Sequence, residues 1–178
     1  MQLRDFIRVY DNVLDPATCN QFIEEVEKRP SDLILHDTPG YKFQQLNINQ
    51  TDLAPVAQQI AQPLAGYAQH YFRELNLNQY VDVQGFEEVR IKKYLKDSNY
   101  EFKTHVDVTN KATAVRYLVF IIYLNDNNGV TTFENLNFSY KPKQGSMIMF
   151  PPTWMFPHAG TIPTDNDKYI MMTCLHYL

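Results

Sequence analysis

The chain has 178 residues, a formal net charge of −4 and 44% hydrophobic residues, and it contains 12 Tyr and 11 Phe. These values are typical of a globular protein with a sizeable core, and they exclude a disordered chain or a membrane protein. The negative charge argues against a nucleic-acid-binding surface, and no apolar run has the length of a membrane span. We therefore expect no nucleic-acid partner and no membrane partner.

The N-terminus lacks the apolar run of a signal peptide, so the cytoplasm is the expected compartment. The two cysteines, Cys19 and Cys174, are accordingly expected as buried thiols and not as a disulfide. No internal repeat, linker or low-complexity run divides the sequence, which predicts a single domain over residues 1–178. No feature of the sequence fixes the oligomeric state.

The first 80 residues predict a supporting strand and helices. Residues 3–11 alternate loosely and predict an opening strand. Asp15 can cap a helix that has Pro16 at its first position, and apolar residues then recur at helical spacing within 16–29.

The next stretch predicts a loop followed by a second helix. Residues 31–50 are expected to form a loop with short strands and to carry no chemistry. Residues 52–77 carry an apolar stripe that predicts a helix packed on the outside of a sheet, and Pro63 is expected to kink or divide it.

From residue 82 the hydrophobic period becomes two, which predicts strands. Seven or eight short strands with turn signals between them indicate a β-sandwich or jelly roll. They are expected at 82–95, 101–108, 115–125, 130–134, 138–141, 145–150, 157–160 and 168–177.

For the strand at 82–95, the sequence does not decide what its polar face contacts. Glu88, Arg90, Lys92 and Tyr94 share one face, and the opposite face is mostly apolar. We therefore expect the strand to be half-buried, with the polar face toward either solvent or a polar pocket.

Three residues suggest a metal centre. His105 and Asp107 are two apart, so on an extended segment their side chains lie on the same side. His158, set between Pro157 and Gly160 at a strand edge, is the best candidate for a third ligand. Two histidines and one carboxylate are the ligand set of mononuclear non-haem Fe(II) oxygenases, although zinc can also bind such a set.

Each of these residues also has a plain structural interpretation, because a His-x-Asp pair occurs by chance in many chains. The specific signal is the complete order of motifs: His-x-Asp, an apolar strand, Tyr-Leu-Asn-Asp, Gly-Val-Thr-Thr-Phe, Gly-Ser-Met-Ile-Met-Phe-Pro, Pro-His-Ala-Gly and Asp-Lys-Tyr-Ile. In this order residues 82–178 resemble the prolyl 4-hydroxylase-like branch of the Fe(II)- and 2-oxoglutarate-dependent dioxygenases.

The resemblance implies a fold and a set of site residues. The fold would be mainly β with flanking helices, a double-stranded β-helix (jelly roll) over residues 82–178 with the helices of residues 1–80 packed on one sheet. His105, Asp107 and His158 would bind iron and act in catalysis. Lys168 would pair with the far carboxylate of 2-oxoglutarate, and Tyr123 and Tyr94 would line the same pocket. Arg116 falls where related enzymes place a substrate-facing arginine.

Two departures from the family pattern are visible. The usual Gly-Gly after the Tyr-Leu-Asn-Asp turn is Asn128-Gly129-Val130 here. The interval from Asp107 to His158 is short beside collagen-type enzymes, so loops that shape a substrate groove are missing.

The position of Lys168 in its strand supports, independently of the resemblance, a role in the pocket. On a strand it shares a face with Ile170, Met172 and Cys174, which points it into the barrel. A buried ammonium needs an anionic partner, which a co-substrate carboxylate would supply. The alternative is that Lys168 extends to solvent beside Asp167.

The function expected from the resemblance is a hydroxylase that uses Fe(II), 2-oxoglutarate and O2, with ascorbate as a reductant, and acts on a peptidyl proline. The partner would be a peptide, protein or small-molecule substrate. Trp154, Tyr100 and Arg116 are the expected substrate contacts. Three alternatives stay open: oxidation of a free amino acid or other small molecule, a metal-binding jelly roll without turnover, and a zinc hydrolase.

Overall fold

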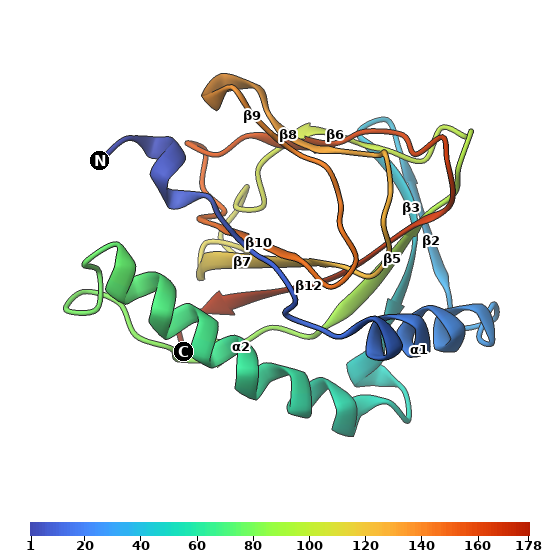
Figure 1. Ribbon diagram of the computed structural model, residues 1–178, viewed down its shortest axis with the longest axis horizontal. Helices are drawn as coiled ribbons and strands as arrows, with labels where there is room; N and C mark the ends of the chain where they lie inside the picture. Colours follow the sequence, from blue (N-terminus) through green and yellow to red (C-terminus); the bar gives the residue numbers. More distant parts are fainter.

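The structure is a computed structural model that describes residues 1–178. A long antiparallel sheet curls over itself, and two helices cover one outer face of it (Figure 1). The strands are β1 (Arg8–Tyr10), β2 (Ile34–Thr38), β3 (Tyr41–Asn47), β4 (Gly85–Phe86), β5 (Arg90–Tyr94), β6 (Phe102–His105), β7 (Arg116–Tyr123), β8 (Thr131–Phe133), β9 (Phe138–Tyr140), β10 (Met147–Phe150), β11 (His158–Gly160) and β12 (Lys168–His176). The helices are α1 (Pro16–Glu27) and α2 (Ala54–Glu74), with 3-10 turns at Leu3–Phe6, Ile48–Gln50 and Glu134–Leu136.

The strand order is β1-β10-β7-β12-β5-β3-β6-β11-β8-β9, with β2 paired to β3 and β4 to β12. The larger layer consists of β1, β10, β7, β12, β5 and β3. The smaller layer, above it in Figure 1, consists of β6, β11, β8 and β9. The two layers join at one pair of residues, Tyr41 of β3 and Phe102 of β6. The predicted jelly roll with helices packed on one sheet is confirmed.

Strand β7 shows why the sequence contains so long an apolar run. Alternate side chains of a strand point to opposite faces. Leu118, Phe120 and Ile122 belong to the core that faces the helices, whereas Val119, Ile121 and Tyr123 belong to the core between the two layers. Since both faces are buried, nearly every position of this strand is apolar.

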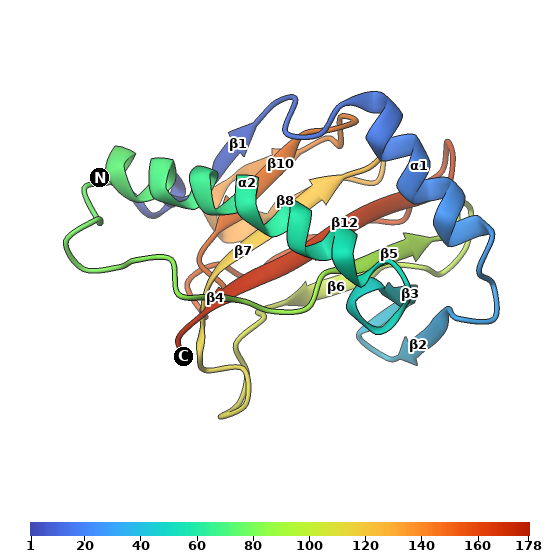
Figure 2. The ribbon, with the colours of Figure 1, turned by 90° about the horizontal axis from the view of Figure 1, so that it is seen from below.

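Both predicted helices are present. Asp15 caps α1 by accepting a hydrogen bond from the Thr18 amide at 3.0 Å, and Pro16 stands at the first helical position, as the sequence indicates. Helix α2 crosses β7 and β12 on the outer face of the larger layer (Figure 2). It runs unbroken through Pro63, so of the two outcomes expected at that residue, a kink or a division, the division is wrong. Neither helix combines the length and apolarity that a membrane span requires.

Two predictions for the N-terminal half need correction. Only Arg8–Tyr10 of the expected opening strand is extended, because the residues before it form a 3-10 turn. Residues 31–50, expected as a loop with short strands, contain such strands as the paired β2–β3 hairpin, so only the loop character was overstated. The polar residues of that hairpin obscured its alternation in the sequence.

Strand β5 also differs from its prediction. It lies between β12 and β3, with a layer of side chains on either face, so it is buried and not half-buried. Lys93 points outward and forms an ion pair with Glu27 of α1 at 2.6 Å. Lys92 points inward, toward the space between the two layers. The two cysteines are free and buried, as expected.

Gly145 provides a test of this fold. Its φ is +75°, and a Cβ there would overlap the carbonyl oxygen of Leu14, which is main chain and cannot move aside easily. We expect Gly145→Ala to lower the free energy of unfolding by about 1–3 kcal/mol, because both the conformation and the contact are unfavourable. Chemical denaturation followed by circular dichroism measures this change.

Gly66 is the matched control for that substitution. It is exposed in the middle of α2, and a Cβ there would meet no atom within 4 Å. Gly66→Ala should raise the stability by about 0.5–1 kcal/mol, because alanine favours the helix and restricts the unfolded chain. Equal effects of the two substitutions would contradict the backbone described here.

Candidate active site

Three candidate metal ligands converge between the two layers. β6 and β11 pair in antiparallel register so that His105 stands opposite His158, and Asp107 follows β6 in the next turn. The ligand atoms of His105, Asp107 and His158 all lie within 4.8 Å of one another. Strand pairing thus brings together residues that are more than fifty positions apart in the sequence.

The two imidazoles are oriented by main-chain carbonyls. Nδ1 of His105 lies 2.8 Å from the carbonyl oxygen of Lys103, and Nδ1 of His158 lies 3.1 Å from that of Phe156. Each Nδ1 must carry the hydrogen to donate it, so each Nε2 keeps a free lone pair. These Nε2 atoms lie 3.7 Å and 3.6 Å from the carboxylate oxygens of Asp107.

The electrostatics of the trio fit a divalent cation. Oδ2 of Asp107 is buried and has no hydrogen-bond partner. Burial lowers the pKa of His158 to about 4, so this imidazole is neutral at physiological pH. Burial alone would raise the pKa of Asp107, but the neighbouring imidazoles outweigh it and hold the pKa below its usual value.

The spacing of the ligand atoms supports the same conclusion. Metal–ligand bonds of about 2.1 Å at right angles separate two ligand atoms by about 3 Å. The Nε2–carboxylate distances of 3.6 and 3.7 Å are only slightly longer, so small side-chain rotations suffice to close a facial site. Two neutral imidazoles and one carboxylate with open positions suit Fe(II).

Lys168 is the second feature of the site. It opens β12 opposite Tyr94 of β5, and it is 3% exposed. Its ammonium forms no ion pair and donates one hydrogen bond, to the Gly129 carbonyl oxygen at 2.7 Å. Burial lowers the pKa of Lys168 to about 7. The expected orientation into the barrel is confirmed, and the alternative contact with solvent is wrong.

Two predicted tyrosines surround this ammonium. The Nζ atom of Lys168 lies 5.7 Å from the ring centre of Tyr94 and 6.0 Å from that of Tyr123. The Tyr123 hydroxyl donates a hydrogen bond to Oγ1 of Thr131 at 2.8 Å. Sequence reasoning missed Thr131. The alternation within Gly-Val-Thr-Thr-Phe was the available signal, since Thr131 shares the inward face with Phe133.

One cavity contains both features. His105, Asp107, His158 and Lys168 all line it, together with apolar side chains of β7 and β12. A small dianion that reached the metal with one end could meet the buried ammonium of Lys168 with the other. Three protein ligands leave coordination positions of a metal ion open for such a molecule.

The inner cavity continues into an outer groove of about 580 Å³. The aromatic side chains of His36, Tyr41, Phe43 and Phe102 form one wall, and they stack on one another with ring-centre distances of 4.7 to 6.5 Å. The β2–β3 hairpin supplies most of this wall. The prediction that residues 31–50 carry no chemistry is therefore at odds with their position.

Arg116 also lines the groove. Its Nε donates to the Glu87 carboxylate at 2.6 Å, and one terminal nitrogen donates to the main-chain oxygen of Asp107 at 3.1 Å. Arg90 forms ion pairs with the same Glu87 and with Glu88, each at 3.4 Å. Arg116 thus supports the segment that carries the carboxylate ligand and also faces the groove.

The structure does not bring the other two predicted substrate contacts into this groove. Trp154 is 78% exposed and lines neither cavity. Tyr100 is buried beneath Lys42, whose Nζ lies 5.4 Å from the ring centre. Proximity in sequence to His158 and His105 did not translate into proximity in space.

Comparison with known proteins identifies the family. A model of the 2OG-Fe(II) oxygenase superfamily matches residues 89–176, close to half of the chain and the part that carries all the candidate ligands. No curated protein matches the chain.

Solved structures share the fold at low sequence identity. A viral collagen prolyl hydroxylase from Paramecium Bursaria Chlorella virus-1, in its 2OG complex, has a TM-score of 0.74 at 18% identity, with 97% of each chain covered. A Pseudomonas putida prolyl-4-hydroxylase has a TM-score of 0.69 at 14% identity, covering 97% of this chain and 93% of its own. A Trichoplax adhaerens prolyl hydroxylase, in complex with a hypoxia inducible factor peptide fragment, has a TM-score of 0.69 at 13% identity, covering 97% and 84%.

The family match falls on the strands that hold the trio and Lys168, and the whole chain superposes on prolyl hydroxylases. The chain belongs to the 2OG-Fe(II) oxygenase superfamily, with a prolyl-hydroxylase-like fold, and is an enzyme that uses Fe(II), 2-oxoglutarate and O2.

Proposed function

We propose that the enzyme hydroxylates a proline within a peptide, with His105, Asp107 and His158 holding the iron and Lys168 holding the far carboxylate of 2-oxoglutarate. The observation that carries the proposal is that the ligand trio and the buried ammonium of Lys168 open into one cavity. When bound, Fe(II) and 2-oxoglutarate supply the oxidising chemistry that places one oxygen atom of O2 on an unactivated C–H bond.

The residues of this chain would prepare that chemistry in defined ways. The carbonyl oxygens of Lys103 and Phe156 hold the two imidazoles in the tautomer that presents Nε2 to the metal. Arg116 fixes the main chain of Asp107, so the carboxylate stays in place. The apolar side chains around Lys168 exclude water, which strengthens its attraction to a carboxylate.

Tyr123 and Tyr94 complete the co-substrate pocket in this proposal. The Tyr123 hydroxyl donates its one hydrogen to Thr131, and a small rotation would let it donate that hydrogen to a carboxylate instead. The Tyr94 ring forms a flat wall against which a short carbon chain can pack. Both side chains are buried, so ordering them costs little entropy when the co-substrate binds.

The outer groove supports a proline as the target residue. Tyr41, Phe43 and Phe102 offer aromatic faces of the kind on which proline rings pack in peptide recognition. A proline-containing segment is already extended and loses little entropy on docking. The Trichoplax neighbour, whose structure includes a peptide fragment, has the same fold. Arg116 is positioned to hold a peptide carbonyl in this groove.

The direct test of this function is a product assay. Proline-rich peptides incubated with Fe(II), 2-oxoglutarate and O2 should gain the mass of one oxygen on proline, with formation of succinate. Fragmentation mass spectrometry locates the modified residue. Oxidation of free amino acids with no peptide product would contradict the peptidyl-proline assignment while leaving the enzyme class intact.

The metal ligands can be tested individually. His105→Ala, Asp107→Ala and His158→Ala should each lower 2-oxoglutarate turnover by at least about 100-fold, because each removes one of three protein ligands. The unfolding midpoint should change far less than the activity. Binding of Co(II), followed by its visible absorption spectrum, should be lost in parallel.

His70→Ala is the matched control for these variants. His70 lies exposed on α2 with its Nε2 3.5 Å from Glu74, far from the cavity. Its replacement should leave turnover and Co(II) binding unchanged. Full activity in His158→Ala would remove the third ligand from the proposal.

Lys168 predicts a specific pH dependence. A bound dianion favours the charged ammonium and so raises the pKa of Lys168 from about 7. The KM for 2-oxoglutarate should therefore be constant below about pH 7 and rise by up to tenfold per pH unit above it, as the free enzyme loses this proton. Initial rates measured between pH 6 and 9 check the slope.

Two substitutions distinguish Lys168 from other titrating groups. Lys168→Ala should raise the KM for 2-oxoglutarate at pH 6.5 by at least about 30-fold, as expected for loss of a desolvated charge contact of about 2–5 kcal/mol, and abolish the rise above pH 7. Lys168→Arg should recover part of the affinity. Lys143→Ala, at an exposed surface position, serves as the control. An unchanged KM in Lys168→Ala would place the co-substrate elsewhere.

A further inference from the structure

We propose that Lys92 forms an anion-binding subsite beside the metal centre and that the hydroxylated substrate carries a carboxylate that binds there. This inference rests on the proposed function and adds to it the chemical class of the substrate. It concerns the inward face of β5, which the sequence shows to be polar. Neither the metal site nor the co-substrate pocket explains why this face carries Lys92.

Lys92 is a buried cation without a counterion. It is 7% exposed, and its Nζ has no carboxylate oxygen within 4.0 Å and donates no hydrogen bond within the protein. Its Nζ lies over the faces of two aromatic rings, 4.4 Å from the ring centre of Phe43 and 5.1 Å from that of Phe102, and the Asp107 carboxylate acts on it only from beyond ion-pair distance. Cation–π contacts compensate only part of the cost of burying an ammonium.

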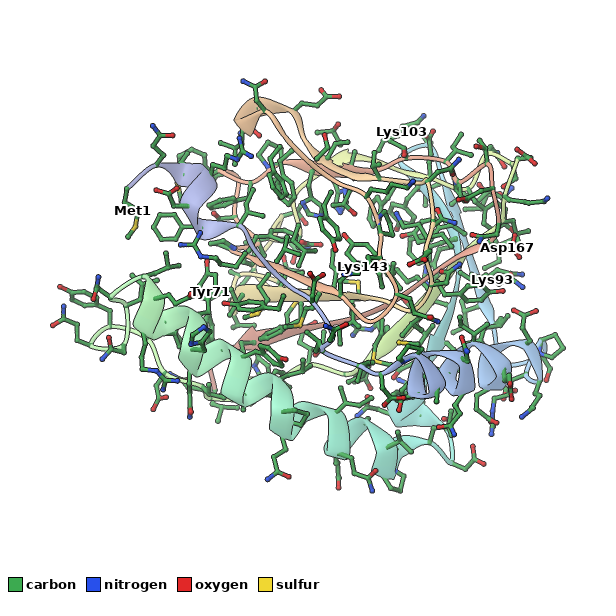
Figure 3. The ribbon with its side chains drawn as sticks, viewed as in Figure 1. Met1, Tyr71, Lys93, Lys103, Lys143 and Asp167 are labelled. Carbon is green, nitrogen blue, oxygen red and sulfur yellow. The ribbon has the colours of Figure 1, made fainter.

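The neighbouring residue on the same strand, Lys93, is a lysine whose charge is neutralised within the protein. Lys93 faces outward and meets Glu27 at 2.6 Å and Asp167 at 3.6 Å. Figure 3 shows Lys93 and Asp167 on the same side of the molecule, close to α1. Two adjacent lysines thus have similar burial, but only the outward one is neutralised by the protein.

Counting the surrounding charges identifies Lys92 as the uncompensated one. The two arginines of the groove, Arg90 and Arg116, are matched by two carboxylates, Glu87 and Glu88. In the proposed function, the two charges of Fe(II) and that of Lys168 are matched by Asp107 and the 2-oxoglutarate dianion. The positive charge of Lys92 remains unmatched after both groups are complete.

The position of Lys92 relates this charge to the substrate. It lines both the inner cavity and the outer groove, so it lies where a bound substrate would approach the metal ligands. The two rings that contact its Nζ, Phe43 and Phe102, also form the aromatic wall proposed for the proline ring. A carboxylate attached close to such a ring would reach the ammonium while the ring packs on the wall.

Two sources could supply this carboxylate, and both bind through the same chemistry. It could be the main-chain carboxylate of a C-terminal proline, or the side chain of an acidic residue next to the proline. Three probes separate them: N-acetylproline, N-acetylproline methylamide, and N-acetyl-glutamyl-proline methylamide. The second probe is neutral and serves as the reference for the other two.

The informative variant is Lys92→Met, which keeps an unbranched side chain only one heavy atom shorter, removes the charge and suits the aromatic surroundings. The wild-type enzyme should hydroxylate one of the two carboxylate probes with a kcat/KM about 10- to 100-fold above that of the neutral probe, as expected for a hydrogen bond between charged groups. Lys92→Met should reduce this preference to less than about threefold. Lys93→Met, the same substitution on the opposite face, should keep the full preference.

Two outcomes would overturn the subsite. One is a wild-type enzyme that turns over all three probes with equal kcat/KM. The other is a Lys92→Met variant that keeps the wild-type preference but has a raised KM for 2-oxoglutarate in turnover without substrate, which would assign Lys92 to the co-substrate.

A binding measurement separates failure of the subsite from failure of the proposed function. Saturation-transfer NMR of the three probes, with Zn(II)-loaded protein and 2-oxoglutarate, requires no turnover. If no probe is hydroxylated, the proline assignment fails, but stronger binding of a carboxylate probe that Lys92→Met abolishes would still support the subsite. Equal signals from all three probes in the wild-type protein would overturn it.

Discussion

The antiparallel pairing of β6 with β11 is the constraint on which the site depends. It sets His105 opposite His158, and the turn after β6 then carries Asp107 to the same point. Strand pairing fixes these positions more firmly than loops could, because each strand is also held by its other neighbour. Every other part of the site, including Lys168 on β12 and the aromatic wall on β3, is positioned relative to this pair by the curl of the sheet.

The interior of this sheet holds more ionisable groups than an apolar core tolerates without a reason. Lys92, Lys168 and Asp107 all lie between the two layers. Neither lysine forms an ion pair, and Asp107 has only the two histidines within ion-pair distance. Burial of such groups lowers the stability of the unbound protein, so their retention indicates ligands that complete them. The same burial that lowers stability also strengthens the attraction of these groups to small charged ligands, because water does not screen it.

The motifs that carry chemistry were readable in the sequence, and the walls around them were not. His105, Asp107, His158 and Lys168 could be predicted because their types and order are specific, and β7 because its run is apolar on both faces. The pairing of β2 with β3 was not predicted, because Gln45 directly after Gln44 interrupts the alternation of β3. Lys92 was left undecided because a lysine on a strand is exposed by default, and only the neighbouring strands reveal its burial.

The single junction between the two layers has a thermodynamic consequence. Tyr41 and Phe102 form the only residue pair that joins β3 to β6, and their rings, 4.7 Å apart, are also part of the groove wall. A molecule that packs on these rings contacts both layers at their narrowest connection. Its binding energy is therefore linked to local opening of the sheet at this seam: occupancy of the groove suppresses the opening, and opening releases the occupant.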